Sequence, residues 1–576
     1  MWKSIACLVL VLTIAAPARA ATIYVDDSAA SGGDGSLARP FASLQAAIDA
    51  AAERDDLFVA GGTYAPIAVA SRELHLFGGY TDDFAMRSPD VSSVIEGTRA
   101  RPTVSLYESG NSVLDGFVIR GGERGVFIDA DFLSTTNRPE VRNNVIEGNG
   151  TATLNGGGVF AIHCDARFVG NTLRGNIAER GPGIATQCAS VLIDGNLVED
   201  NVAYGDHGGG LYLTGPMIVV RGNVIRRNEV GVIIGYGWGA GAVVYGAGVT
   251  ATFERNVFTE NHAESVGSGV FIDDGATATF EHDLFYANDC GSTGGVIYVD
   301  GDGTTVSSHL ELVNVTVAGH VCAPDTAVSS AIYVQSQSTV VIRNSIFWDN
   351  DGADFWADPT STITATYTLT DEPFSGAGNV SADPLFFDAA AGDYHVRSTR
   401  GRFDPSAGSF VLDATDSPTI DVGDPASDFA IEPGPNGMRV NLGHTGNTTQ
   451  ASMGGPGGVP PADGGVGADG GFRVDGGVGA DGGFGADASS PRDGGVAPPP
   501  ASNCGCRVGA PPSRATHALT ATLLFMLLWV TKRRARARPV RYALPHAKPQ
   551  RSSLPADVGR CRARLRRRLL GRRCST

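Results

Sequence analysis

The chain has 576 residues, including 77 glycines, 30 prolines and 9 cysteines, and a net charge of −17 at pH 7. Residues 532–576 hold 16 Lys and Arg against one acidic residue, so the rest of the chain carries −32. A body this acidic excludes nucleic acid as a partner, because phosphate backbones bind basic surfaces.

Residues 1–20 have the pattern of a secretory signal peptide. Lys3 is the charged start, Ile5–Ala16 is the apolar core, and Ala18-Arg-Ala20 is the small-residue cleavage site. The apolar run is too short to span a bilayer, which argues against an uncleaved anchor. We therefore expect an exported protein.

Residues 21–103 predict an N-terminal cap and the first coils of a solenoid. The amphipathic stretch Pro40–Ala50 predicts a helix with Ser43 as its N-cap. Leu57–Tyr64 predicts the first strand and turn.

A repeat organises residues 104–353. The motif Asn-x-x-x-x-Asn recurs after 27, 25, 27 and 33 residues. A period of this size indicates stacked units, each burying its apolar face on its neighbours. The anchors are Asn144, Asn171, Asn196, Asn223 and Asn256, followed by a drifted copy at Asp283 and looser copies at Asn314 and Asn344.

Apolar residues at fixed offsets from these anchors predict inward-facing strand positions. The units are short, rich in Val, Ile and Phe, and broken by Gly and Asn, which is typical of strands rather than helices. The predicted inward residues are Val141, Phe168, Ile193, Val220, Phe253, Phe280 and Val341 before the anchors, and Ile146, Leu173, Val198, Ile225, Phe258 and Phe285 after them.

This pattern resembles the right-handed parallel β-helix proteins of the pectin-lyase-like superfamily. The resemblance implies an all-β solenoid of about ten coils with an N-terminal capping helix. The order of elements in residues 21–103 is similar to the amino-terminal segment of exported bacterial β-helix proteins, where the helix covers the open end of the stack.

The repeated Asn predicts a ladder at a tight turn. Asn tolerates left-handed backbone geometry and bonds its own backbone at turns. Stacked on successive coils, the amides would also bond one another. The alternative is a role of these amides in ligand contact.

Four cysteines lie at matching places in adjacent repeats. Coils stack about 4.8 Å apart, which is within the Cα separation of a disulfide, and an exported protein meets an oxidising compartment. We predict the disulfides Cys164–Cys188 and Cys290–Cys322. The alternative is buried free thiols.

The segment Ile233–Gly248 combines aromatic residues with a flexible backbone. Tyr236, Trp238 and Tyr245 predict a stacking surface for sugar rings. With them we group Asp273 and Asp274 as candidate binding residues. The alternative is a loop pinned by aromatic side chains that pack on the wall of the solenoid.

Residues 354–452 depart from the period and resemble the carboxy-terminal closing module of surface-anchored bacterial β-helix proteins. Residues 453–503 are rich in Gly, Asp and Pro and predict a flexible linker. Gly-Gly-x-Gly-x-Asp occurs there three times at irregular spacing, so Ca²⁺ is a possible but unassigned ligand.

Residues 504–538 hold Cys504-Gly-Cys506, a short apolar run and a cluster of Lys and Arg. This resembles the Myxo-type C-terminal sorting signal, which implies anchor processing at Cys504 or Cys506 and a membrane contact through this segment. It implies the cell surface or outer membrane of a Gram-negative bacterium. The basic tail 539–576 departs from that pattern, which ends soon after the Arg cluster.

The resemblance also raises the question of catalysis. Lyases of this fold use Arg or Lys as a base, often with Ca²⁺. Hydrolases of this fold use three aspartates on neighbouring coils with Gly-His-Gly and Arg-x-Lys; Asp273-Asp274 and Asp206-His207-Gly208 are partial echoes, and the Arg-x-Lys is absent. A Lys base in the β-helix is excluded, because the lysines are Lys3, Lys532 and Lys548.

The sequence thus favours an exported, surface-anchored β-helix protein for recognition or adhesion, with a polysaccharide or another cell-surface ligand as its partner. We expect a monomer and assign no metal or catalytic residue. The alternative is a polysaccharide lyase or glycoside hydrolase.

Overall fold

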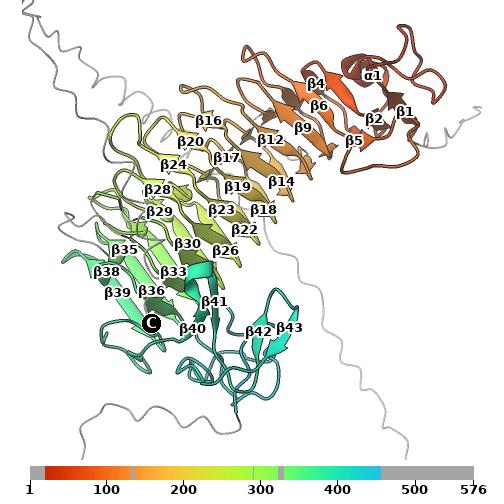
Figure 1. Ribbon diagram of the computed structural model, residues 1–576. Helices are drawn as coiled ribbons and strands as arrows, with labels where there is room; N and C mark the ends of the chain where they lie inside the picture. Colours follow the sequence, from red (N-terminus) through yellow and green to blue (C-terminus); the bar gives the residue numbers. More distant parts are fainter. Residues whose placement is uncertain (1–19, 132–136, 290, 293, 322–329, 456–576) are drawn as a thin grey trace, which may run out of the picture. The chain divides into compact units, whose positions relative to one another are not determined.

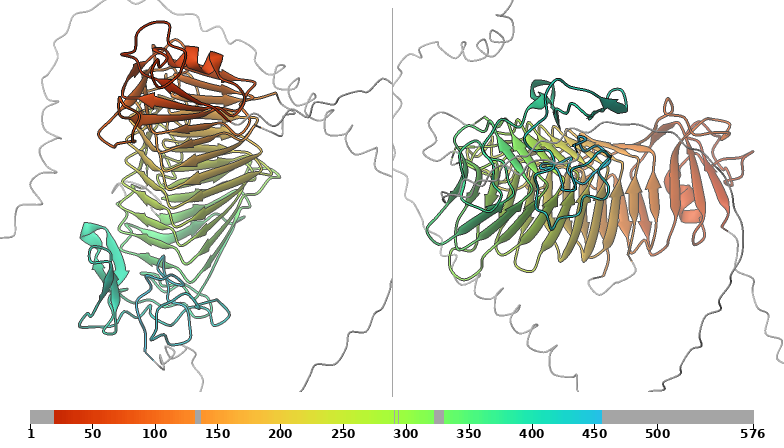
Figure 2. Two further views of the ribbon diagram at one scale, coloured as in Figure 1. Left: turned by 90° about the vertical axis from the view of Figure 1, so that its right-hand side faces the viewer. Right: turned by 90° about the horizontal axis from the view of Figure 1, so that it is seen from below.

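The computed structural model describes residues 20–131, 137–289, 291–292, 294–321 and 330–455 (Figure 1). All of them lie in one compact unit of the chain, Met1–Asp469. Three long sheets hold 13, 11 and 11 strands, and each coil adds one strand to each sheet. Because the pairing between coils is parallel and in register, the strands of successive coils lie side by side (Figure 2).

Sheet 1 follows the sheet 3 strand within each coil and leads into the anchor turn. Its strands are β1 (Thr22–Val25), β2 (Asp56–Ala60), β5 (His75–Tyr80), β8 (Val113–Asp115), β11 (Glu140–Arg142), β14 (Asp165–Val169), β18 (Ser190–Asp194), β22 (Met217–Arg221), β26 (Thr250–Glu254), β30 (Thr277–Glu281), β33 (His309–Val313), β36 (Thr339–Arg343) and β39 (Thr362–Thr366).

Sheet 2 follows the anchor turn. Its strands are β3 (Gly62–Tyr64), β6 (Ser93–Glu96), β9 (Phe117–Arg120), β12 (Val145–Glu147), β15 (Thr172–Arg174), β19 (Leu197–Glu199), β23 (Val224–Arg226), β27 (Val257–Thr259), β31 (Leu284–Tyr286), β34 (Thr316–Ala318) and β37 (Ile346–Trp348).

Sheet 3 completes the coil, and a short fourth sheet precedes it in the middle coils. Sheet 3 consists of β4 (Ile67–Ala70), β7 (Val104–Tyr107), β10 (Val126–Asp129), β13 (Val159–Ile162), β17 (Ile184–Gln187), β21 (Leu211–Thr214), β25 (Ala242–Tyr245), β29 (Val270–Asp273), β32 (Ile297–Val299), β35 (Ser330–Val334) and β38 (Ala353–Ala357). The short sheet consists of β16 (Ile177–Ala178), β20 (Val202–Ala203), β24 (Glu229–Val230) and β28 (His262–Ala263).

Helix α1 (Leu44–Ala50) packs on the first coils, as the sequence predicts. The Ser43 hydroxyl accepts a hydrogen bond from Ala46 N at 3.3 Å and caps the helix. Leu44 and Ile48 are buried and join the same core as Val25 of β1. The helix therefore covers apolar surface at the start of the stack.

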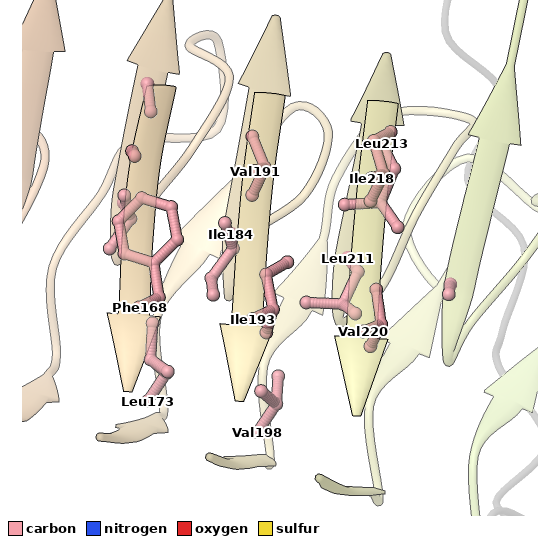
Figure 3. Packing of buried hydrophobic residues seen from close by; sticks show 14 of the residues in the cluster. Phe168, Leu173, Ile184, Val191, Ile193, Val198, Leu211, Leu213, Ile218 and Val220 are labelled. Carbon is pink, nitrogen blue, oxygen red and sulfur yellow. The ribbon is translucent and has the colours of Figure 1, made fainter. Parts of the chain in front are cut away.

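The core runs through all the coils between the three sheets. Inward residues of one column follow one another on successive strands, for example Phe168, Ile193 and Val220 on sheet 1 (Figure 3). Each of these three is fully buried. Further along, Phe253 and Phe280 stack with centroids 4.2 Å apart, so aromatic rings fill the later coils.

Two Asn ladders run along the stack, one at each end of the sheet 2 strands. In the first ladder, Asn144 Nδ2 donates to Asn171 Oδ1 at 3.1 Å and to Leu114 O at 2.9 Å. The same arrangement continues through Asn196, Asn223 and Asn256, and Asp283 ends it as an acceptor. The second ladder consists of Asn149, Asn176, Asn201, Asn228, Asn261 and Asn288.

The prediction that the ladder Asn residues adopt left-handed backbone geometry is wrong. The left-handed residue is the one before it, for example Asn143 at φ 53° and Gly170 at φ 62°. The ladder Asn has an ordinary φ, and its side-chain amide forms hydrogen bonds with the neighbouring coils. The turn is therefore shared between a residue that bends the backbone and a residue that satisfies buried polar groups.

The looser copies at Asn314 and Asn344 are out of register by one residue. The strand pairing aligns Asp283 with Val315 and Ser345, and Asn314 and Asn344 take the left-handed place. The same slip makes the predicted inward residue Val341 37% exposed, while Ile342 is buried.

One predicted disulfide lies in the described part of the chain. Cys164 and Cys188 are bonded, with Cα atoms 4.7 Å apart, and both are buried in the main core. The second predicted pair, Cys290–Cys322, lies outside the described residues, as do Cys504 and Cys506.

The β-helix continues to Thr366, past the expected boundary at residue 353, because β38 and β39 extend sheets 3 and 1. The segment that follows has two hairpins and no repeat. These are β40 (Phe386–Asp388) with β41 (Asp393–Val396), joined by the 3₁₀ turn η1 (Ala389–Ala391), and β42 (Arg402–Asp404) with β43 (Ser409–Val411).

This closing segment, residues 367–455, is bonded to the anchor turns of the last coils. Asn314 Nδ2 donates to Asn441 O at 2.9 Å, and Asn344 Nδ2 donates to Ser427 Oγ at 2.9 Å. Asn314 and Asn344, which lie one residue out of the ladder register, thus bind the closing segment. Leu442 packs beside Ile346 in a shared apolar cluster.

The outer face of sheet 2 carries charges that alternate in sign from coil to coil. Register pairs Glu96 with Arg120, and the column continues as Glu147, Arg174, Glu199 and Arg226. Ion pairs join Arg174 to Glu147 and Arg226 to Glu199, each at 2.7 Å. Successive coils therefore neutralise one another on this face.

Candidate functional site

The outer face of sheet 3 carries a column of aromatic residues in the later coils. Strand pairing places Phe271 of β29 beside Tyr298, followed by Tyr333 and Trp356. Tyr298 and Tyr333 stack with centroids 4.7 Å apart, and Tyr333 and Trp356 with centroids 4.0 Å apart. These rings form an apolar cluster separate from the main core.

Carboxylates lie beside this column on the same face. Alternation along a strand puts Asp273 on the same side as Phe271. Asp300 is its counterpart on the next coil, since Ile272 pairs with Val299 and Asp300 N donates to Ile272 O at 2.9 Å. Asp300 Oδ2 accepts a hydrogen bond from Gln335 Nε2 at 2.6 Å.

His207 and Trp238 form the other wall. They are paired by a parallel bridge just before sheet 3, and their ring centroids are 4.9 Å apart. Asp206 Oδ1 lies 2.8 Å from His207 Nδ1 and 2.8 Å from Arg180 Nη2. Arg180 is thereby occupied by Asp206, which also lies beside the imidazole.

These walls enclose a hollow of about 410 Å³, which we call the sheet 3 cavity. Its lining combines flat rings with carboxyl and amide groups, the composition of a site for a polar ligand with apolar faces. The lining residues are His207, Trp238, Val266, Phe271, Asp273, Tyr298, Asp300 and Gln335.

Among the residues that the structure describes, no cation forms an ion pair with Asp273 or Asp300 of the cavity. Burial, with the neighbouring Asp300 and Asp274 carboxylates, raises the pKa of Asp273 to about 7. In the described ranges, the ion pair at this cavity is the one that Asp206 makes with Arg180. Burial lowers the pKa of His207 against the pull of Asp206, so its imidazole is neutral at pH 7.

The structure brings three of the five predicted binding residues to one place. Trp238 and Asp273 line the cavity, and Tyr245 is the register partner of Asp273. Tyr236 does not line the cavity; it is 48% exposed and contacts Trp238, with ring centroids 5.6 Å apart. Asp274 takes the left-handed turn position after β29 and raises the pKa of Tyr245 together with burial, which is the larger cause.

Tyr298, Asp300 and Gln335 are site residues that the sequence did not single out. A signal for Asp300 was present, since Ile272-Asp273 and Val299-Asp300 are 27 residues apart, as are the anchors Asn256 and Asp283. His207 was noted only as part of an incomplete catalytic echo. Its partner Trp238 lies in the longest coil, whose extra residues hide the register.

Two larger hollows lie on the outer face of sheet 2. The first, of about 760 Å³, is lined mostly by the paired charges of the alternating column, together with Arg99, which donates hydrogen bonds to the carbonyls of Gly150 and Gly148. The second, of about 840 Å³, lies beside hairpin β40–β41. There Tyr286 packs against Tyr394, and Tyr394 against Phe386, so these rings hold the hairpin on the stack.

Neither a metal centre nor a spanning helix occurs in the described residues. No group of three or more His, Cys, Asp or Glu there is placed to hold a metal ion. No helix within those ranges is long and apolar enough to cross a membrane.

The family model for the right-handed β-helix region matches residues 92–258, 155–317 and 240–371. No curated protein matches the chain.

A pectate lyase, Pel9A, is 12% identical, with 74% of this chain and 96% of that chain covered and a TM-score of 0.42. An alginate lyase from Paenibacillus sp. str. FPU-7 is 12% identical over 60% and 98%, with a TM-score of 0.29. A rhamnogalacturonan lyase is 13% identical over 69% and 96%, with a TM-score of 0.27. Likeness at this level carries no statement about activity. The family match and the three parallel sheets together identify the repeating body of this chain as a right-handed parallel β-helix.

Proposed function

We propose that this protein is an exported, surface-anchored β-helix protein that binds a polysaccharide in the sheet 3 cavity. The signal-peptide pattern of residues 1–20 and the sorting-signal pattern of residues 504–538 support export and anchoring. The observation that carries the binding proposal is the meeting of Trp238 and Tyr298 with Asp273, Asp300 and Gln335 around one hollow.

The chemistry of sugars explains why this combination suits a glycan. A pyranose presents C–H groups on its faces and hydroxyl groups around its edge. Aromatic rings pack against the faces, while carboxylates and amides accept and donate hydrogen bonds at the edge. Repeated coils place equivalent groups about 4.8 Å apart along the face, which suits an extended polymer.

Trp238→Ala is expected to weaken polysaccharide binding by about ten-fold, because the ring supplies a wall of the cavity. Retention of a polysaccharide panel by the purified full-length chain, followed by titration of the retained polymer, measures the loss. Tyr107→Ala is the matched control, since Tyr107 is a 39% exposed aromatic on β7 of the same sheet, far from the cavity in the strand order. Equal affinity of the wild type and Trp238→Ala would contradict the proposed site.

Cleavage of the bound polymer is a second candidate function, favoured by the pair Asp273 and Asp300. A carboxyl group with a raised pKa can protonate a glycosidic oxygen while a neighbouring carboxylate stays ionised. New reducing ends without unsaturated products would establish a hydrolase, whereas new reducing ends with unsaturated products would establish a lyase. In either case Asp273→Asn is expected to abolish product formation. Retention without product leaves binding as the function.

A further inference from the structure

The charge of the sheet 3 cavity selects its ligand, an inference that rests on the proposed glycan binding. Asp273 and Asp300 face the cavity from adjacent coils, and Asp274 lies next to them. Arg180, a guanidinium close to these groups in the described part of the chain, is paired with Asp206 at 2.8 Å. A polymer of uronic acids would bring more carboxylates to a site where none of the described cations is free to meet them.

The aromatic walls add a second preference. Ring faces carry negative electrostatic potential and attract cations, and Trp is the most effective of the three aromatic side chains. Trp238 and Tyr298 line the same hollow as the two carboxylates. An ammonium group placed here would meet carboxylate oxygens on one side and ring faces on the other.

The titration of Asp273 reflects the burial and the negative charge of this cavity. Burial and the negative charge of Asp300 raise the pKa of Asp273 to about 7, so this carboxyl is partly protonated at neutral pH. A bound ammonium group would favour the ionised form. The aromatic walls and the carboxyl groups of the cavity therefore both favour a cationic ligand.

We infer that the sheet 3 cavity takes a glycan with free amino groups, such as a polymer of glucosamine units, and disfavours polyuronates. The ammonium group would lie between Asp273 and Asp300, with a sugar face on the aromatic wall formed by Trp238 or Tyr298.

The test compares three polymers of similar length on the purified full-length chain at about pH 6 and low salt. These probes are a glucosamine polymer, its fully N-acetylated counterpart, which is neutral, and polygalacturonate, which is anionic. We expect the glucosamine polymer to bind at least about ten-fold more tightly than the acetylated polymer, and polygalacturonate to be retained least. The preference should weaken as salt is added, because salt screens charge interactions.

Asp300→Asn separates this site from the general acidity of the chain. Asn keeps an oxygen that can accept the Gln335 hydrogen bond, so the fold around it is preserved. The variant is expected to lose most of the preference for the amino polymer, because its affinity for the amino polymer should fall much more than its affinity for the acetylated one. Asp49→Asn, at an exposed position on α1, removes one charge elsewhere and should change neither.

The outcomes distinguish the two levels of the argument. Equal binding of the amino and acetylated polymers, or tighter binding of polygalacturonate, would overturn the inferred ligand class and leave glycan binding in place. An amino-polymer preference unchanged in Asp300→Asn would also overturn it, because general acidity would then be the cause. Retention of none of the three polymers would overturn the inference, and failure across the wider panel would overturn the proposed function itself.

Discussion

Phe280→Ala is expected to lower the free energy of unfolding by about 3–5 kcal/mol, the range for deleting a buried phenyl ring. Phe280 is fully buried on β30 and stacks on Phe253 of the preceding coil with centroids 4.2 Å apart and planes at 3°. It also contacts Phe285, with centroids 5.6 Å apart. Neighbouring coils cannot collapse into the space, because the hydrogen bonds between parallel strands fix their spacing.

Urea unfolding followed by circular dichroism measures this loss. Phe280→Leu keeps much of the volume and should lose clearly less, while Tyr236→Ala, at a 48% exposed position, should change stability by no more than about 0.5 kcal/mol. A loss below about 1 kcal/mol for Phe280→Ala would show that the phenyl column is not a close-packed part of the core.

Asp283→Asn is expected to stabilise the protein by about 1–3 kcal/mol near pH 7–8, the cost of leaving a buried polar group unsatisfied. Asp283 ends the first ladder and is completely buried. Its Oδ1 accepts hydrogen bonds from Asn256 N at 2.7 Å and Nδ2 at 2.8 Å, whereas its Oδ2 is buried without a hydrogen bond in the described structure. An Asn side chain would present an amide donor there.

The preceding coils show what that donor would reach. Asn223 Nδ2 donates to Ile193 O and Asn256 Nδ2 to Val220 O. Because Val220 pairs with Phe253, the equivalent acceptor for residue 283 is Phe253 O. The substitution therefore extends the Asn pattern of the preceding coils to the position where the first ladder ends.

The effect depends on pH with a defined sign. Burial raises the pKa of Asp283 well above its ordinary value in the folded state. The protonated form is favoured by folding, so this group contributes stability below the unfolded pKa of about 4, and that contribution is lost as pH rises through the folded pKa. The advantage of Asp283→Asn should thus be largest in neutral and alkaline buffer and shrink toward pH 4.

Asn256→Asp, the converse substitution at the preceding ladder position, is the control. It places a second carboxyl in the same ladder and should lower stability at pH 8 more than at pH 5. Unfolding curves of the three proteins at both pH values measure the pattern. A pH-independent gain for Asp283→Asn would mean that Asp283 is not titrating in the folded protein and would contradict the argument.

The repeat was predictable because its spacing is nearly constant. Asn144 to Asn256 occupy the same turn on successive coils, and a spacing of 25–33 residues with apolar positions on both sides is enough to indicate stacked strands. The one-residue slip at Asn314 and Asn344 was not predictable, because Asn is acceptable both in the ladder and at the left-handed place before it. Only the strand register distinguishes the two places.

The candidate site was predicted in part for a related reason. Trp238, Tyr245 and Asp273 stand out as aromatic and acidic residues near one another in sequence. Asp300 and Gln335 reach the same hollow from the following coils, and His207 from a preceding one. A site built across coils depends on the exact length of each repeat, and the loop around Ile233–Tyr236 makes one repeat longer than the rest.

The alternating column on sheet 2 has a consequence for how this chain can gain or lose repeats. Removing the coil that carries Arg174 would set Glu147 against Glu199, and like charges on paired strands repel. Removing the next coil as well would set Glu147 against Arg226, which restores attraction. The backbone repeats once per coil, but the charge pattern repeats every two coils. Duplication or deletion of coils in this region is therefore favoured in pairs. A change of two coils keeps the alternation of charge, whereas a change of one coil places like charges on paired strands.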